Sequence, residues 1–230
     1  MFFFDPMYFV FVLPALLLAM WAQFKVQGAY AKWLQVPNRR GLTGYEAARQ
    51  LLSNGQVLDV SIEGVPGKLS DHYDPRSKTL RLSQDVANGR SVASLAIVAH
   101  EVGHAMQDAT GYAPLKFRGT IVPAVQIGAW VGPAMFFLGL LLNLSSLAWL
   151  GLILFAGTTV FSLVTLPVEF NASSRALAML RDNAVVTSEE ELRGAKSVLD
   201  AAALTYVAAL AQSLMTLLYY VSILSNDRRR

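Results

Sequence analysis

Residues 121–168 read IVPAVQIGAWVGPAMFFLGLLL, then NLSS, then LAWLGLILFAGTTVFSLVTLPV, so two apolar runs flank a four-residue break. An α-helix needs about 20 consecutive apolar residues to cross the hydrocarbon core of a bilayer, and each run is long enough. Because the break is so short, the two runs predict a tight hairpin of membrane-spanning helices. This hairpin indicates the fold class, a mainly α, multi-pass membrane protein.

Two further apolar runs, 8–24 and 203–224, bring the expected number of spans to about four. No Lys or Arg precedes the first run, and no clear A-x-A site ends it. We therefore interpret this run, with the aromatic Phe2–Phe4 ahead of it, as an uncleaved anchor rather than a signal peptide. The last run carries Gln212 and several small residues, a pattern that favours packing against other helices.

The composition agrees with a membrane protein and excludes several other classes. Hydrophobic residues make up 54% of the chain and charged residues only 15%, well below the share typical of soluble domains. There is no cysteine, which excludes disulfides and thiolate metal ligands. The net charge is +3, and no basic stripe with interleaved aromatic residues is present, so we do not expect a nucleic-acid partner.

The polar segment 25–120, between the first two spans, predicts a small α+β domain. Thr43 or Gly44 stands where a residue would cap a short helix over 45–52. Alternating apolar and polar residues, separated by turn residues, then predict a small β-meander. Its three strands are expected at 57–62, 68–73 and 79–82.

A helix capped by Ser91 or Ser94 and ending near Gly111 should follow, apolar nearly all round and therefore buried. It contains His100–His104, an H-E-x-x-H motif with two of the three histidines in the chain. Residues four apart lie on one face of a helix, so both imidazoles can reach the same ion. Glu101 is offset from them, which suits a general base acting on a metal-bound water. The motif predicts a zinc hydrolase centre.

Catalytic zinc needs three protein ligands and one open position, so a third ligand must come from elsewhere. Thr110 occupies the position of the third histidine in the metzincin pattern, which excludes that class. The choice lies between the upstream His72 and a downstream carboxylate. Glu169 is the better carboxylate, because a two-span hairpin returns the chain to the membrane surface at which the H-E-x-x-H helix ended.

Three stretches together carry a family resemblance: HEVGHAMQ at 100–107, DHYDPR at 71–76 and LPVEFNAS at 166–173. They resemble the YugP-like bacterial membrane zinc metallopeptidases and, more distantly, the HtpX-like membrane gluzincins. The resemblance implies a gluzincin-like metallopeptidase domain that binds one catalytic Zn²⁺. It also implies His100, His104 and Glu169 as zinc ligands and Glu101 as the general base.

The chain departs from the HtpX-like pattern in one position next to the proposed site. Those enzymes have an aspartate four residues after the third ligand, where this chain has Ser173. Asn171 or Ser173 is therefore expected to orient a ligand side chain instead.

Two further residues are candidates for stabilising the oxyanion of the reaction. His72 could act as a ligand or as a hydrogen-bond donor from a strand beside the site, or it could be a polar residue of a turn-rich hairpin. Tyr112 follows the motif helix, where packing is the alternative role.

The predicted function is a membrane-integrated zinc endopeptidase that cleaves polypeptides, including membrane or membrane-adjacent ones. The alternative is a catalytically silent membrane scaffold or adaptor with a structural zinc site. The intact Glu101 argues against that alternative, because a structural site needs no general base. A transporter is a weaker third reading, since no inverted repeat is evident.

Basic residues predict which side of the membrane carries the site. Four of them follow the first span, namely Lys25, Lys32, Arg39 and Arg40, and none precedes it. By the positive-inside rule the metal site should face the cytoplasm of a bacterial cell, at its (inner) membrane. Arg228–Arg230 would lie outside if the last run crosses fully. The expected divisions are the anchor 1–24, the metallopeptidase domain 25–120, the hairpin 121–168, the third-ligand region 169–202 and the last span with its tail 203–230.

Overall fold

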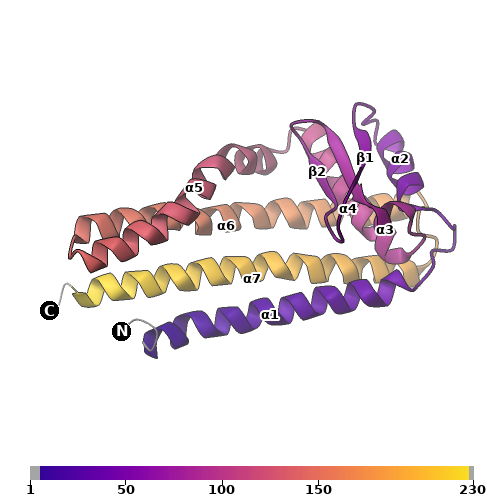
Figure 1. The fold of residues 1–230 in the computed structure, drawn as a ribbon. Helices are drawn as coiled ribbons and strands as arrows, with labels where there is room; N and C mark the ends of the chain where they lie inside the picture. The colour runs from indigo at the N-terminus through magenta and orange to yellow at the C-terminus, as the bar shows by residue number, and fades with distance from the viewer. Residues whose placement is uncertain (1–5, 228–230) are drawn as a thin grey trace. The chain divides into compact units, whose positions relative to one another are not determined.

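The computed structural model describes residues 6–227, and Phe2–Phe4 and Arg228–Arg230 lie outside the described residues. Within that range the chain is mainly helical, with seven helices and three short strands (Figure 1). The helices are α1 (Pro6–Leu34), α2 (Gly44–Asn54), α3 (Gln84–Asn88), α4 (Val92–Ala109), α5 (Ala113–Leu141), α6 (Ser145–Asp182) and α7 (Glu189–Asp227). The strands are β1 (Ser61–Val65), β2 (His72–Asp74) and β3 (Thr79–Ser83).

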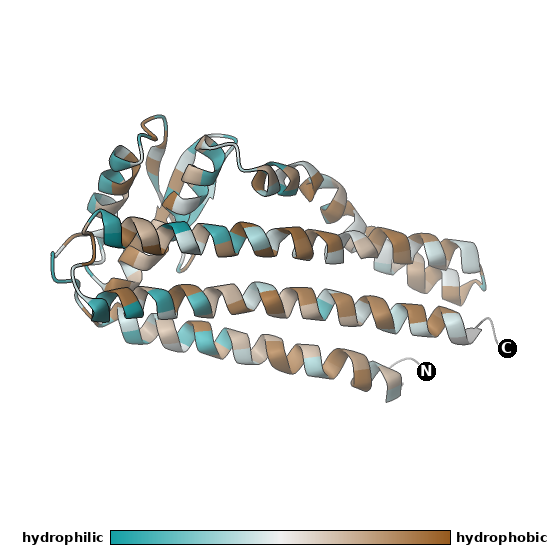
Figure 2. Ribbon diagram, turned by 180° about the vertical axis from the view of Figure 1, so that it is seen from behind, coloured by the Kyte–Doolittle hydropathy of each residue, from teal (hydrophilic) through white to brown (hydrophobic). Residues whose placement is uncertain are grey.

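Four helices, α1, α5, α6 and α7, are long and apolar enough to cross a membrane. Figure 2 shows hydrophobic residues along these long helices. Each helix extends beyond the apolar run that predicted it, because helical hydrogen bonding continues into the polar sequence at the end of a span. The predicted fold class, a mainly α protein with about four spans and a small α+β portion, is confirmed.

The predicted hairpin is formed by α5 and α6, which pack backbone against backbone. A side chain added at Gly139 would come within 2.4 Å of the Ala148 backbone, and one at Gly151 within 2.4 Å of the Phe136 backbone. Asn143 turns the chain with a positive φ of 55°, a conformation that asparagine tolerates better than most residues. Small residues at the contact thus let the two helices approach closely.

The helices α2 and α4 begin where the sequence predicted, whereas the short α3 was not predicted. Thr43 and Glu46 form a capping box at the start of α2, each side chain accepting a hydrogen bond from the backbone N–H of the other. Ser91, rather than Ser94, caps α4, and its hydroxyl accepts from the Ser94 N–H at 3.1 Å. α4 is largely buried, as expected from its apolar surface.

The sheet is not the β-meander that the sequence predicted. Its strand order is β1-β3-β2, with β1 parallel to β3 and β2 antiparallel to β3. β3 is the most buried of the three strands, so it takes the central place, and the more exposed β1 and β2 form the edges. The meander prediction was wrong because it assumed that strands pair in chain order.

The first two strands also begin later than predicted. Leu69, inside the second predicted strand, has a positive φ of 53°, which is incompatible with an extended strand. At the start of the first predicted strand, the Val57 N–H donates back to the Leu52 carbonyl oxygen of α2 at 3.0 Å. Val57 is instead buried in the hydrophobic core that contains α2 and α4 residues.

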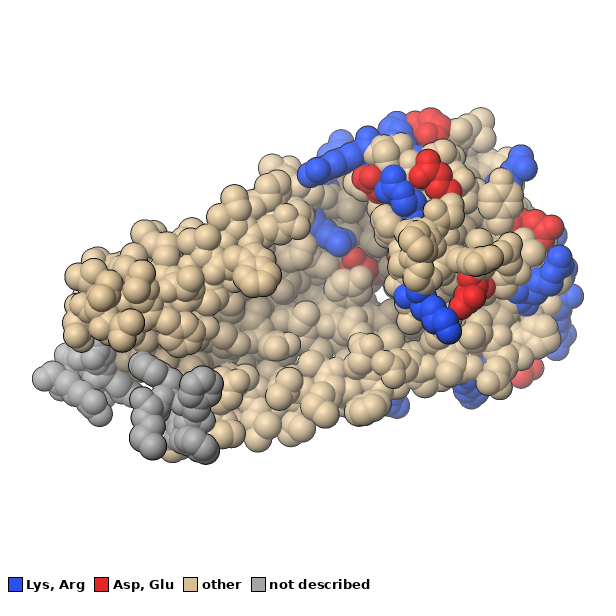
Figure 3. Space-filling view, in the orientation of Figure 1, with Lys and Arg blue, Asp and Glu red and all other residues tan. Residues whose placement is uncertain are grey.

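The chain divides into two compact units, each with a hydrophobic core of its own. Of the described residues, the helical unit comprises 6–23, 116–167 and 205–227, and the site unit comprises Phe24–Leu115 and Val168–Leu204. In the helical unit, Phe136 stacks on Tyr220 with ring centroids 4.2 Å apart. Most charged side chains visible in Figure 3 belong to the part of the chain that carries the sheet, whereas the long helices show a largely uncharged surface.

Candidate metal centre

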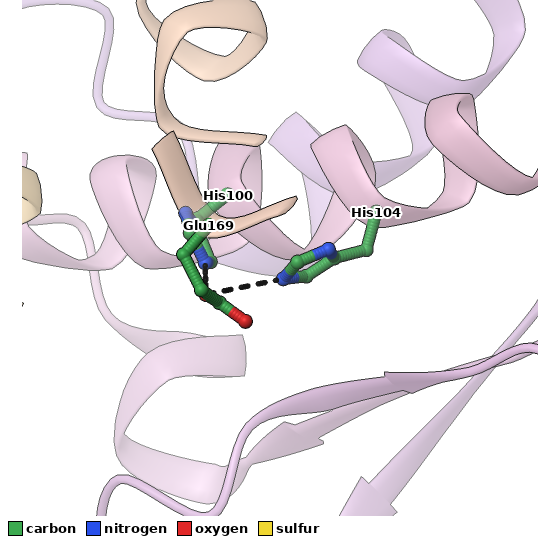
Figure 4. A group of neighbouring side chains, drawn as sticks. All are labelled: His100, His104 and Glu169. Atoms are coloured by element: carbon green, nitrogen blue, oxygen red, sulfur yellow. Dashed lines mark hydrogen bonds and ion pairs between the residues drawn. The ribbon is translucent and has the colours of Figure 1, made fainter. Parts of the chain in front are cut away.

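Three side chains from two helices of the site unit converge on one point (Figure 4). His100 and His104 lie one turn apart on α4, and Glu169 faces them from α6. The Glu169 Oε2 lies 3.2 Å from His100 Nε2 and 3.6 Å from His104 Nε2. One potential ligand atom from each residue lies within 4.8 Å of the others. The structure thus brings together the three residues that the sequence analysis named as ligands.

A glycine makes this approach of the two helices possible. A Cβ atom at Gly103 would lie 2.7 Å from the Ala172 carbonyl oxygen, closer than real Cβ contacts. Gly103 lies between the two histidines on α4, and Ala172 is one turn after Glu169 on α6. The absent side chain therefore lets α6 pack directly against the segment of α4 that carries the imidazoles.

The donor set fits a zinc ion. Imidazole nitrogens and a carboxylate oxygen are common zinc ligands, and bond lengths of about 2.0–2.2 Å place neighbouring ligand atoms of a tetrahedral site about 3.4 Å apart. The observed separations of 3.2 and 3.6 Å between the Glu169 oxygen and the two nitrogens bracket that value. The side chains are 13%, 12% and 2% exposed for His100, His104 and Glu169, so a buried carboxylate lies beside two imidazoles that solvent can still reach.

Glu101 lies next to this cluster, on the side of α4 that faces β2. Its Oε2 accepts a hydrogen bond of 3.0 Å from the backbone N–H of Tyr73. Burial raises the pKa of the Glu101 carboxyl above its ordinary value, and this effect outweighs the opposing influence of His100 and His104. A carboxyl with a raised pKa in such a place is suited to accept and return a proton.

Tyr73 also joins β2 to α4 through its side chain. Its hydroxyl donates to Asp108 Oδ2 at 2.9 Å. Burial and this hydrogen bond raise the pKa of the Tyr73 phenol, which therefore stays protonated. Tyr73 and Asp108 could not be identified as partners from the sequence, because their pairing depends on how β2 lies along α4.

Each imidazole has a hydrogen-bond partner on its outer nitrogen. Ser173 Oγ lies 3.2 Å from His100 Nδ1, and Gln107 Oε1 lies 2.9 Å from His104 Nδ1. Asn171, the other predicted orienting residue, instead accepts a hydrogen bond from Gln107. Gln107 was missed, although its position three residues after His104 on the same helix could have indicated it.

His72 and Tyr112 are not part of the three-residue cluster. His72 is exposed on β2, and its Nδ1 lies 2.8 Å from the Ser70 carbonyl oxygen. Tyr112 follows the end of α4, where its N–H donates to the Gln107 carbonyl oxygen at 2.9 Å. Both residues belong to the site unit.

Comparison with known proteins identifies the class. The family model described as "Putative neutral zinc metallopeptidase" matches residues 8–225. The chain belongs to this family. A curated relative named "Putative membrane protease YugP", from Bacillus subtilis (strain 168), is 45% identical over 223 residues, covering 96% of this chain and 99% of the relative. No solved structure matches the chain. The chain is thus a membrane zinc metallopeptidase homologue with four candidate transmembrane helices.

Proposed function

We propose that this protein is a zinc-dependent endopeptidase of the bacterial cell membrane, with His100, His104 and Glu169 as zinc ligands and Glu101 as general base. The observation that carries the proposal is the convergence of the two Nε2 atoms and the Glu169 carboxylate next to a partly buried Glu101. Family membership supports the same chemistry. The substrates are polypeptides, including membrane or membrane-adjacent ones.

When bound, zinc supplies Lewis acidity that lowers the pKa of a coordinated water and stabilises negative charge on the substrate carbonyl oxygen. Glu101 takes the proton of the attacking water on a carboxylate oxygen and passes it to the leaving amine. The raised pKa of Glu101 helps the carboxyl to keep this proton until the amine leaves. The Tyr73 N–H holds the carboxylate beside the cluster until substrate enters.

The remaining candidates have supporting roles in this proposal. Ser173 orients His100 through its Nδ1 atom. Asn171 contacts no proposed histidine ligand itself but accepts a hydrogen bond from Gln107, which orients His104. His72 and Tyr112 are the candidate donors to the oxyanion. An extended substrate adds to the sheet at the free edge of β2, where main-chain hydrogen bonds require little sequence specificity.

Two substitutions separate metal binding from chemistry. Glu101→Gln should retain zinc and lose about 100-fold or more in casein cleavage, because the amide cannot accept the proton. Glu169→Ala should lose both zinc and activity, because it removes a ligand. Zinc content and proteolysis of the purified full-length chain in detergent measure the two effects.

Glu190→Gln is the matched control, since Glu190 is exposed at the start of α7, and it should behave as wild type. Undiminished cleavage by Glu101→Gln would refute the assignment of the base. Full zinc content in Glu169→Ala would direct attention to His72 as the third ligand. Zinc binding without any proteolysis by the wild type would favour the alternative function, a silent membrane scaffold with a structural zinc site.

A further inference from the structure

Gln107 is a fully buried polar side chain that connects α4 to α6 beside the cluster. Its exposed fraction is 0%. Its Oε1 lies 2.9 Å from His104 Nδ1, and its Nε2 lies 2.8 Å from the Val168 carbonyl oxygen and 3.0 Å from Asn171 Oδ1. The amide nitrogen thus has two specific partners and the carbonyl oxygen has one, and the two partners of the nitrogen flank Glu169 in the sequence.

The chemistry of those partners determines which way the amide faces. The Val168 carbonyl can only accept a hydrogen bond, so the group that faces it must be the NH₂ of Gln107. On the far side, Arg175 Nε lies 2.8 Å from Asn171 Oδ1, and a guanidinium can only donate. Asn171 therefore presents its oxygen to Arg175 and, with the same atom, to the Gln107 NH₂. The Val168 carbonyl and the Arg175–Asn171 pair therefore require the same orientation of the Gln107 amide.

This orientation in turn determines the protonation of His104. With its NH₂ directed at Val168 and Asn171, Gln107 presents only its carbonyl oxygen to His104 Nδ1. An oxygen acceptor needs a donor opposite it, so Nδ1 carries a proton, and in the neutral imidazole Nε2 is then the nitrogen available to a metal ion. It is Nε2 that lies 3.6 Å from Glu169, within the cluster.

The outer nitrogen of His100 has no such determinant. Its Nδ1 partner is the hydroxyl of Ser173, which can donate or accept, so this hydrogen bond is compatible with either tautomer. The two proposed ligands therefore differ in how far the protein prepares them for a metal ion.

We propose that Gln107 is a positioning residue with two roles. Its carbonyl oxygen holds His104 in the Nδ1–H tautomer, and its NH₂ group binds the part of α6 that carries Glu169. One side chain thus positions two of the proposed ligands. The inference rests on the proposed function, because it concerns the same metal site. Groups that orient a metal-bound histidine typically change metal affinity about 10- to 100-fold when removed.

Zinc affinity tests the inference without relying on activity. The dissociation constant of the full-length chain in detergent would be measured by competition with a chelating zinc indicator. Gln107→Leu removes the acceptor and the donors while keeping a similar size, and it should weaken zinc binding about 10- to 100-fold. Gln84→Leu is the control, because Gln84 is exposed in α3 of the same unit, and it should leave affinity unchanged.

Gln107→Glu distinguishes orientation of His104 from simple helix packing. Its carboxylate still accepts the His104 proton but cannot donate to Val168 or Asn171. If orientation of the imidazole is what matters, this variant should bind zinc much more tightly than Gln107→Leu. An equal loss of zinc affinity in both variants would overturn the proposal that Gln107 orients His104, even if Gln107→Leu is poorly folded.

Nuclear magnetic resonance of the ¹⁵N-histidine-labelled chain gives a direct reading, because the chain has only three histidines. The metal-free wild type should show neutral His104 protonated at Nδ1, and metal-free Gln107→Leu should lose that single tautomer while His72 is unchanged. Zinc binding by the wild type with unchanged affinity in Gln107→Leu would overturn this inference alone. A wild type that binds no zinc would overturn the proposed function as well.

Discussion

Ser173 is the residue that contacts the outer nitrogen of His100 in the proposed zinc site. It stands on α6 one turn after Glu169, where its hydroxyl meets His100 Nδ1 at 3.2 Å. A hydroxyl is a weaker partner for an imidazole than a carboxylate, because it carries no charge and can turn away. The interaction should therefore contribute modestly to zinc affinity, less than the buried Gln107 does.

Ser173→Ala should accordingly weaken zinc binding by about 10-fold, the lower limit for loss of a residue that orients a ligand. The neighbouring Ser174 is exposed and provides the matched control, so Ser174→Ala should bind zinc as the wild type does. Chelator competition measures both constants. Equal affinities for the two variants would show that the Ser173 hydroxyl does not orient His100.

At the scale of elements, the site depends on the contact between α4 and α6. The two proposed histidine ligands belong to one helix and the carboxylate to another, so their separation is set by how closely the helices pack. Gly103 permits the closest approach, to the Ala172 carbonyl. A ligand set built on rigid helices in this way needs little rearrangement to bind a metal.

Gly103→Ala should therefore disrupt the site despite the greater helix propensity of alanine. The added methyl group would meet the Ala172 backbone at 2.7 Å, and such overpacking typically costs about 1–3 kcal/mol. We expect a lower unfolding temperature and weaker zinc binding, measured by thermal denaturation and chelator competition.

Gly28→Ala is the matched control within α1, since an added Cβ there meets nothing within 4 Å. That change should stabilise the chain by up to about 1 kcal/mol through helix propensity alone. The proposed role of close packing would be untenable if Gly103→Ala were as stable as Gly28→Ala and bound zinc equally well.

At the scale of the whole molecule, the distribution of charge predicts the orientation in the membrane. Basic residues follow the first span and flank the hairpin on the side of the site, whereas the hairpin loop has none. Since basic segments are retained in the cytoplasm, the proposed active site should face inward. The tail Arg228–Arg230 opposes this assignment, but the first span usually dominates orientation.

The absence of cysteine makes this orientation simple to test by single-cysteine labelling. Ser146→Cys, exposed in the first turn of α6 next to the hairpin turn, should react with a membrane-impermeant maleimide in intact cells. Gln84→Cys, exposed beside the sheet, should react only after the cells are permeabilised. The cysteine-free wild type is the blank, and the reverse labelling pattern would mean that the site faces outward.

The sequence by itself determined the features that depend on neighbouring residues. Apolar runs of sufficient length predicted the spans, and the spacing of His100 and His104 placed both on one helical face. Candidate caps at Thr43 or Gly44 and at Ser91 or Ser94 marked the starts of two helices, and the structure selected Thr43 and Ser91. These patterns are local, because helix geometry relates residues three or four apart.

Only the tertiary structure decided the features that depend on distant residues. It put β3 between β1 and β2, brought Glu169 to within 3.2 Å of His100, and paired Gln107 with the chain around Glu169. The sequence left both Glu169 and His72 as candidates for the third ligand, and only the tertiary structure placed Glu169 beside the two imidazoles. The physical reason is that such contacts depend on how whole helices and strands pack, and packing is a property of the completed core rather than of any one segment.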